Sequence, residues 1–158
     1  FSIKVFKKHL KIFMFKIFKI TKKRVIKKRS KKNSEHKKYY KDAKLLVIKI
    51  IEDLKKENHK INLLTFNKIF IKNQKTRWGS CSSAKNLNFN YKILFLPYDL
   101  AEYLVVHELC HLEHMNHSKD YWNLVEYVLP NYKMSHKRLK NINLNQLNQN
   151  TVYTDDLV

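Results

Sequence analysis

The chain has 158 residues, of which 44% are hydrophobic, so it is long enough and apolar enough for one domain with a core. Its formal net charge is +20, and its apolar runs are too short to cross a bilayer, which argues against a membrane-spanning protein. Two cysteines and no recognisable secretory leader predict a cytoplasmic protein.

The positive charge is concentrated in a leader, residues 1–35. Residues 1–38 hold 16 Lys and Arg against one acid, a net charge of +15, which leaves +5 of the total for the rest of the chain. Apolar residues of the leader recur at helical spacing among lysines, at Phe6, Leu10, Phe13, Ile17 and Ile20. This pattern is typical of a basic amphipathic helix that binds nucleic acid or an anionic surface, and equally of a lysine-biased segment outside the core.

The next elements alternate between helix and strand. Residues 36–58 carry an apolar stripe at helical spacing and predict a helix, whereas residues 66–71 are rich in Phe and Ile and predict a strand. Gly79, the only glycine in the chain, marks a bulge, a tight bend or a close approach of the backbone. Residues 87–91 alternate between apolar residues and asparagines, which predicts a strand with a solvated asparagine face.

The C-terminal half is predicted to be helical. Ile93–Pro97 runs extended into a helix that starts at Asp99. Ser118 is placed to cap a further helix, and a last helix covers about Tyr132–Ile142 before a polar tail, residues 143–158. Together with the strands, these helices predict an α+β domain over residues 36–142.

His107, Glu108 and His111 form a His-Glu-x-x-His motif. On a helix, the two histidines lie one turn apart on one face, so both imidazoles can bind one metal ion, with Glu108 beside them. Two neutral imidazoles and a third nitrogen or oxygen ligand leave one tetrahedral position open, which is typical of a catalytic zinc site rather than a structural one. The same short pattern also occurs on exposed polar helices that bind no metal.

Two histidines compete for the third ligand position. His117 cannot share the face of the first pair if the helix continues, because each residue turns by about 100°. We therefore expect the helix to end near Met115–Asn116, with a left-handed turn at Asn116 that brings His117 back to the metal. His114, three residues after His111, is the alternative, and we favour His117 because the chain has not yet bent at His114.

Five separate motifs follow one another along the chain: Lys75–Ser82, Leu87–Asn90, Tyr103–Leu112, Asn116–Ser118 and Tyr121–Trp122. In order and spacing they resemble the YgjP-like metal-dependent hydrolases, a zincin group related in pattern to the WLM and SprT-like peptidases. The likeness covers about residues 36–142. Family members usually carry a β-rich module before the first helix, and residues 1–35 do not match that module well.

The resemblance implies an α+β zincin-like fold, in which a small antiparallel or mixed sheet packs on the active-site helix with flanking helices. It also implies one zinc ion per chain, held by His107, His111 and His117, with Glu108 as the general base. We therefore expect a zinc metallopeptidase that cleaves peptide bonds of a protein or peptide with a metal-activated water molecule. Glu108 would take the proton of this water and pass it to the leaving amine.

Two questions stay open at this level. The oxyanion stabiliser that such a reaction needs could be a backbone amide near Trp78–Gly79, the side chain of Arg77 or the hydroxyl of Tyr121. The alternative function is a nucleic-acid-associated protein that uses its basic leader, with or without peptidase activity on DNA-bound proteins.

Overall fold

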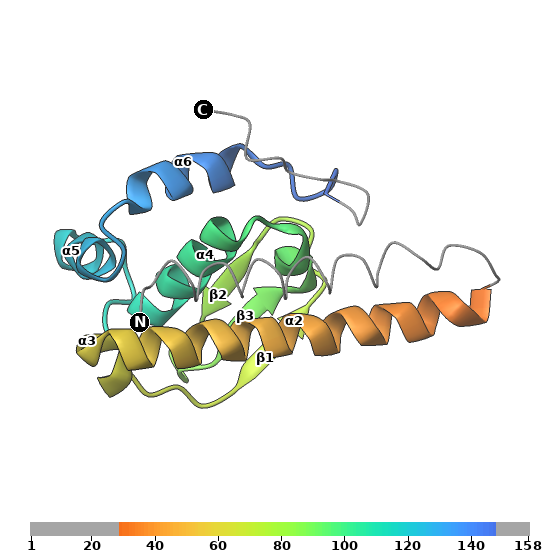
Figure 1. Cartoon of the computed structure of the whole chain (residues 1–158), viewed down its shortest axis with the longest axis horizontal. Coiled ribbons are helices and arrows are strands. Elements are labelled where there is room, and N and C mark those ends of the chain that lie inside the picture. The colour runs from red at the N-terminus through yellow and green to blue at the C-terminus, as the bar shows by residue number, and fades with distance from the viewer. Residues whose placement is uncertain (1–28, 148–158) are drawn as a thin grey trace, which may run out of the picture. The chain divides into compact units, whose positions relative to one another are not determined.

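The structure of the chain, a computed structural model, describes residues 29–147 (Figure 1). The chain divides after residue 34 into two units, and the fold described below is that of the second unit, residues 35–158. The amphipathic helix predicted for the leader, with its nucleic-acid or anionic-surface role, lies outside the described residues, as do residues 148–158 of the polar tail. The predicted division at residues 35 and 142 stays a prediction.

The described residues form helices around a small sheet. In chain order the elements are α2 (Arg29–Glu57), α3 (His59–Leu63), β1 (Ile69–Lys72), β2 (Gly79–Cys81), β3 (Leu87–Asn90), the 3₁₀ helix Tyr91–Phe95, α4 (Tyr98–Cys110), α5 (Lys119–Val128) and α6 (Tyr132–Asn141). The strand order is β1-β3-β2, with β1 parallel and β2 antiparallel to β3. The predicted α+β class with a small mixed sheet is therefore confirmed. Among the described residues, no helix has the length and apolar character that a membrane span requires.

Helix α4 is the buried element of the domain and contacts β2, α5 and α6 (Figure 1). It is apolar on nearly all sides, and its buried residues are at most 4% exposed: Leu100, Ala101, Tyr103, Leu104, Val105, Val106, Glu108, Leu109 and Cys110. A helix that is apolar all round is stable only inside a core. Side chains at its C-terminal end are therefore held by packing on several sides.

Helix α2 covers the core with the apolar stripe that the sequence predicts. Six of its side chains are at most 9% exposed: Ala43, Leu46, Val47, Ile50, Ile51 and Leu54. The spacing of these residues places them on one face of the helix, and lysines and acids occupy the other faces. The predicted helix over residues 36–58 is confirmed, although α2 begins earlier, at Arg29.

The two asparagines of β3 are buried, so the predicted solvated face is wrong: Asn88 is 7% exposed and Asn90 is 0% exposed. Asn90 Nδ2 donates to the carbonyl oxygens of Gln74 at 2.7 Å and Arg77 at 3.2 Å, and Asn90 Oδ1 accepts from the amide of Lys92 at 3.2 Å. A buried amide with these partners fixes the backbone that it bonds. Asn90 therefore anchors the loop that leads into β2.

The segment before α4 also differs from the prediction. Ile93–Pro97 was expected to be extended, but Tyr91–Phe95 forms a 3₁₀ helix because the side chain of Asn90 caps its first turn. Only the end of the predicted segment is extended. Helix α4 then begins at Tyr98, one residue before the predicted start at Asp99.

Candidate active site

Helix α4 carries His107 in its last turn and ends at Cys110, so His111 is its C-cap. The prediction that the helix runs on to Met115–Asn116 is wrong. The last turn tightens because the amides of Leu112 and Glu113 donate to carbonyl oxygens three residues back, those of Leu109 and Cys110, at 3.0 and 3.2 Å. His107 and His111 remain one turn apart, as the spacing of the motif predicts.

His117 reaches the other histidines because it directly precedes α5. The predicted left-handed turn at Asn116 is wrong, since Lys85 alone has a positive φ among residues 29–147. The bend has already been made by the turn after α4. Ser118 caps α5 as predicted, because its Oγ accepts a hydrogen bond from the amide of Tyr121 at 3.3 Å. The start of α5 therefore sets the direction of the chain at His117.

Two aromatic residues of α5 hold the histidine rings. The hydroxyl of Tyr121 donates to the carbonyl oxygen of His107 at 3.0 Å, which ties α5 to the end of α4. The ring of Tyr121 stacks on His111 with centroids 4.6 Å apart, and Trp122 stacks on His117 at 5.5 Å. The three imidazoles are thus oriented by packing as well as by the backbone.

The imidazoles of His107, His111 and His117 converge. One ring nitrogen of each lies within 4.8 Å of those of the other two, and the Nε2 atoms of His107 and His117 are 3.2 Å apart. His111 Nδ1 lies 2.9 Å from the carbonyl oxygen of His114, so this nitrogen carries the proton and leaves Nε2 as the lone-pair donor. His114 takes part through its carbonyl, and its ring is not in the group.

Burial keeps these imidazoles neutral. It lowers the pKa of His107 to about 3, and the nearby His111, His117 and His136 lower it further as like charges. Burial also lowers the pKa of His111 and the pKa of His117 below the usual value. Neutral imidazoles offer lone pairs at physiological pH, which is the form that binds a metal ion.

Glu108 packs against the only glycine of the chain. Glu108 is 4% exposed, and burial raises the pKa of its carboxyl group to about 8. A Cβ atom on Gly79 would lie 2.5 Å from Glu108 Oε1, so the strand β2 approaches the carboxyl as closely as a backbone without a side chain allows. Of the three readings of Gly79 left open by the sequence, the structure selects the close approach.

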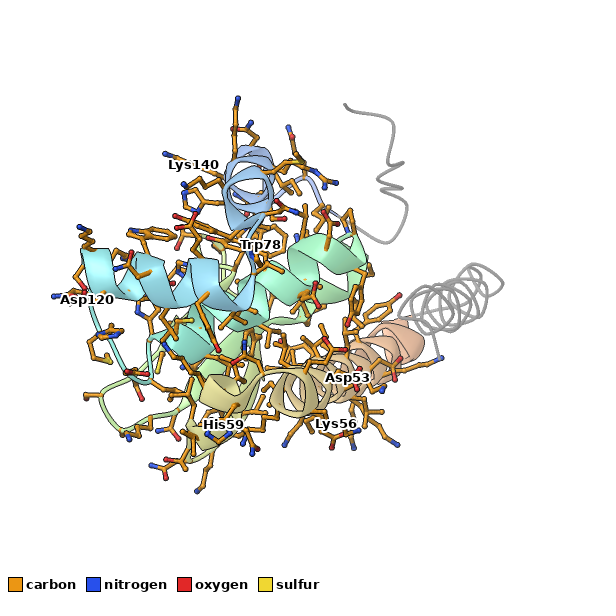
Figure 2. All side chains as sticks on the ribbon, turned by 60° about the vertical axis from the view of Figure 1, so that its left-hand side comes forward. Asp53, Lys56, His59, Trp78, Asp120 and Lys140 are labelled. Atoms are coloured by element: carbon orange, nitrogen blue, oxygen red, sulfur yellow. The ribbon has the colours of Figure 1, made fainter. Side chains whose placement is uncertain are left out.

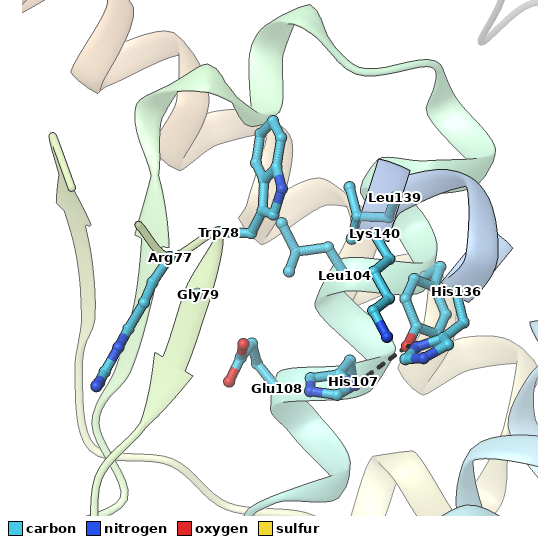
Figure 3. Close-up of a pocket in the computed structure, with 10 residues that line it drawn as sticks. Arg77, Trp78, Gly79, Leu104, His107, Glu108, His136, Leu139 and Lys140 are labelled. Carbon is cyan, nitrogen blue, oxygen red and sulfur yellow. Dashed lines mark hydrogen bonds between the residues drawn. The ribbon is translucent and has the colours of Figure 1, made fainter. Parts of the chain in front are cut away.

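A cavity of about 260 Å³ opens beside this carboxyl. Trp78 and Gly79 line it from the strand side, His107 and Glu108 from α4, and His136 from α6 (Figure 3). One buried oxygen of Glu108, Oε2, has no hydrogen-bond partner among the described residues. Because Glu108 lines the cavity and no described residue occupies the lone pairs of this oxygen, its carboxyl can accept a proton or a hydrogen bond from a molecule that enters.

This donor set fits a zinc ion. Nitrogens bound to tetrahedral zinc at about 2.0–2.1 Å are about 3.3 Å apart, and the two Nε2 atoms of His107 and His117 are 3.2 Å apart. Burial raises the pKa of Glu108 because it disfavours the ionised carboxylate, and a cation at these nitrogens would offset that penalty. The separation of these two nitrogens and the charge of Glu108 therefore both suit the metal.

Sequence reasoning did not single out Tyr103 or His136, which both contact this site. The hydroxyl of Tyr103 lies 3.2 Å from His107 Nδ1 and 2.7 Å from His136 Nδ1. Tyr103 precedes His107 by four residues, a spacing that places two helical side chains together and could have indicated the contact. His136 lies on another helix, and no local pattern connects it to the motif.

Three imidazoles that converge beside a buried carboxyl group are the arrangement expected of a metal-dependent hydrolase. The chain belongs to the YgjP-like family: the model of the YgjP-like metallopeptidase domain matches residues 3–142. The match starts well before residue 36, so it includes the leader that the motifs left out. The protein is thus a metallopeptidase-like hydrolase, and its substrate class is a protein or peptide.

Similar solved structures include two metallopeptidase zymogens. Abylysin of Pyrococcus abyssi has 26% identity and a TM-score of 0.47, with 56% of this chain and 90% of that chain covered. Jannalysin of Methanocaldococcus jannaschii has 24% identity and a TM-score of 0.47, with 62% of this chain and 91% of that chain covered. A comparison with curated proteins gives no match. Likeness at these TM-scores assigns no residue of this chain.

Proposed function

We propose that the chain is a zinc-dependent peptidase in which His107, His111 and His117 hold one zinc ion and Glu108 is the general base. The observation that carries the proposal is the convergence of three imidazole nitrogens, within 4.8 Å of one another, next to a buried carboxyl oxygen that has no partner among the described residues. Three nitrogen ligands leave a fourth position for water or substrate, which is typical of catalytic rather than structural zinc.

The two parts of the site have different tasks. A zinc ion bound by the histidines would supply a Lewis acid that polarises a carbonyl group and lowers the pKa of water. Glu108 takes a proton from a water molecule in the cavity, and the oxygen of that water attacks the scissile carbonyl carbon. The same carboxyl then delivers this proton to the amine that leaves when the C–N bond breaks.

The position of Glu108 suits this task. Gly79 approaches Oε1 so closely that the side chain is held against β2. Oε2 is buried without a hydrogen-bond partner among the described residues, so no protein group occupies its lone pairs. Burial raises the pKa of this carboxyl, and a cation at the neighbouring imidazoles would lower it again toward the ionised form that accepts a proton. A freely exposed glutamate would not be held in this way.

Glu108→Gln separates metal binding from chemistry. The variant keeps the size of the side chain and cannot accept a proton, so it should keep about one zinc ion per chain and its fold. Cleavage of a peptide library that the wild type cleaves should fall at least about a hundredfold. Glu113→Gln is the matched control, because Glu113 is an exposed glutamate of the turn after α4 and should retain activity and zinc.

Two results would count against the proposal. Full activity of Glu108→Gln would exclude this glutamate as the base, and loss of zinc from that variant would make it a ligand or a support for one. A wild-type protein that binds zinc and cleaves no peptide would contradict the peptidase assignment. The cytoplasmic location stays a prediction. The nucleic-acid alternative depends on the leader, of which residues 1–28 lie outside the described residues.

A further inference from the structure

Helix α6 brings a fourth histidine to the cavity. His136 Nδ1 lies 2.7 Å from the hydroxyl oxygen of Tyr103, and the same oxygen lies 3.2 Å from His107 Nδ1 (Figure 3). Tyr103 is 2% exposed, so water does not compete for these bonds. The ring of His136 also packs edge-on against Trp122, with centroids 5.3 Å apart.

The position of α6 is set independently of this contact. Arg138 pairs with Asp99 in the first turn of α4, and Leu139 is buried at 7% exposure. Tyr132, at the start of α6, stacks on Trp122 of α5 with centroids 5.3 Å apart. Because these contacts fix both ends of α6 on its neighbours, the place of His136 beside Tyr103 does not depend on one hydrogen bond.

The hydrogen-bond chain determines which nitrogen of each ring carries a proton. The oxygen of Tyr103 has one proton to donate, so it cannot donate to both histidines. In the proposed site His107 binds metal through Nε2, so its Nδ1 carries the proton and donates to Tyr103. The hydroxyl of Tyr103 must then donate to His136 Nδ1, so the ring proton of His136 is on Nε2.

This arrangement leaves a hydrogen-bond donor on a residue that lines the cavity. Nε2 is on the far side of the His136 ring from the atom that Tyr103 holds, and His136 lines the same cavity as His107 and Glu108. Of the side-chain donors that the sequence suggested, Tyr121 already donates its hydroxyl proton to the carbonyl oxygen of His107. Arg77 points away from His107 in Figure 3. His136 is therefore better placed than either side chain to meet a substrate.

We propose that His136 is a further catalytic residue, whose Nε2–H donates a hydrogen bond to the oxygen of the scissile carbonyl as that oxygen gains negative charge. Tyr103 is the positioning residue that holds the His136 ring in the required tautomer. The proposal rests on the proposed peptidase function and assigns its missing oxyanion donor. No covalent bond to His136 forms or breaks, so no further reactant is needed.

The tautomer can be tested without any turnover. Side-chain ¹⁵N NMR of the zinc-loaded protein should show His136 protonated at Nε2 and unprotonated at Nδ1. Tyr103→Phe removes the hydroxyl, and the His136 signals should then show a mixture of tautomers. Tyr98→Phe, the same change at the start of α4, is the control and should leave the signals unchanged. His136 protonated at Nδ1 in the wild type would overturn the proposal.

Kinetics test the role of the donor. His136→Ala should lower kcat by about a hundredfold or more, the usual loss for one oxyanion donor, with KM and zinc content little changed. His136→Gln places an amide N–H near the position of Nε2 and should recover part of this loss. His59→Ala is the matched control, because His59 is exposed on α3, far from Lys140 of α6 (Figure 2). A kcat of His136→Ala within about twofold of the wild type would overturn the proposal.

A binding measurement separates the two proposals. A peptide phosphinate carries a tetrahedral anionic centre like that of the reacting carbonyl, and the zinc-loaded His136→Ala protein should bind it about a hundredfold more weakly than the wild type does. Equal binding by both would overturn the role of His136 and leave the peptidase function intact. A wild type that neither cleaves peptides nor binds the phosphinate would overturn both.

Discussion

Gly79→Ala should displace the carboxyl of Glu108 without disturbing the metal ligands. The added Cβ would lie 2.5 Å from Glu108 Oε1 and 2.9 Å from the carbons Cδ and Cγ, where ordinary contact begins at 3.4 Å. The oxygen must therefore retreat by about 0.9 Å, the difference between 3.4 and 2.5 Å. The clash involves the end of a side chain rather than backbone, so Glu108 is the group that moves.

The expected effect on catalysis is large and the effect on stability is small. A misplacement of about 1 Å at a reacting group costs about a hundredfold in rate, so kcat on a cleaved peptide should fall by that order. The free energy of unfolding should change by less than about 2 kcal/mol, because overpacking opposes the gain from replacing a flexible glycine. Peptide cleavage, urea unfolding and zinc content of the same preparation measure the three quantities.

The control lies one residue further along β2. Ser80→Ala changes a side chain in the same strand but leaves the backbone carbonyl that Asn88 Nδ2 bonds at 3.2 Å, so activity should stay near the wild-type level. If Gly79→Ala keeps full activity, the carboxyl either tolerates this displacement or is not the base. If Gly79→Ala loses zinc, the contact with Glu108 supports the ligands instead, and the reasoning from position fails.

The remaining predictions concern charge, ligands and thiols. In the metal-free protein, burial raises the pKa of Glu108 from 4.5 to about 8. Between these two pH values the folded state keeps the proton of Glu108 while the unfolded state has released it, so the folded state loses stability as pH rises. Urea unfolding should show the wild type losing about 3 kcal/mol relative to Glu108→Gln between about pH 5 and pH 8, and a constant difference would contradict this. In a chelator competition, His117→Ala should weaken zinc binding strongly. His114→Ala should not, because it keeps the backbone carbonyl that His111 Nδ1 contacts. The reverse result would make His114 the third ligand in place of His117. Alkylation should reach half-buried Cys81 before Cys110, because burial raises the pKa of the Cys110 thiol to about 12, and equal rates would show that α4 opens.

Local chemistry let the sequence alone predict several parts of the structure. The helical stripe of residues 36–58 and the cap at Ser118 depend on neighbours a few residues apart, and both are confirmed. The spacing of His107 and His111 likewise requires only a helix. The ends of helices were predicted less well, because the end of α4 depends on hydrogen bonds of the turn that follows it rather than on a glycine or proline.

The amino-acid sequence by itself determined the long helices, two of the three strands, the family and the motif that places Glu108 between two histidines. Only the tertiary structure decided what surrounds that motif. Gly79 meets Glu108 across the space between a strand and a helix, Asn90 is buried because it bonds a distant loop, and His136 reaches Tyr103 from another helix. These contacts join residues that are 13 or more apart in the chain, so no local periodicity encodes them, and they exist only when packing of the core brings the elements together.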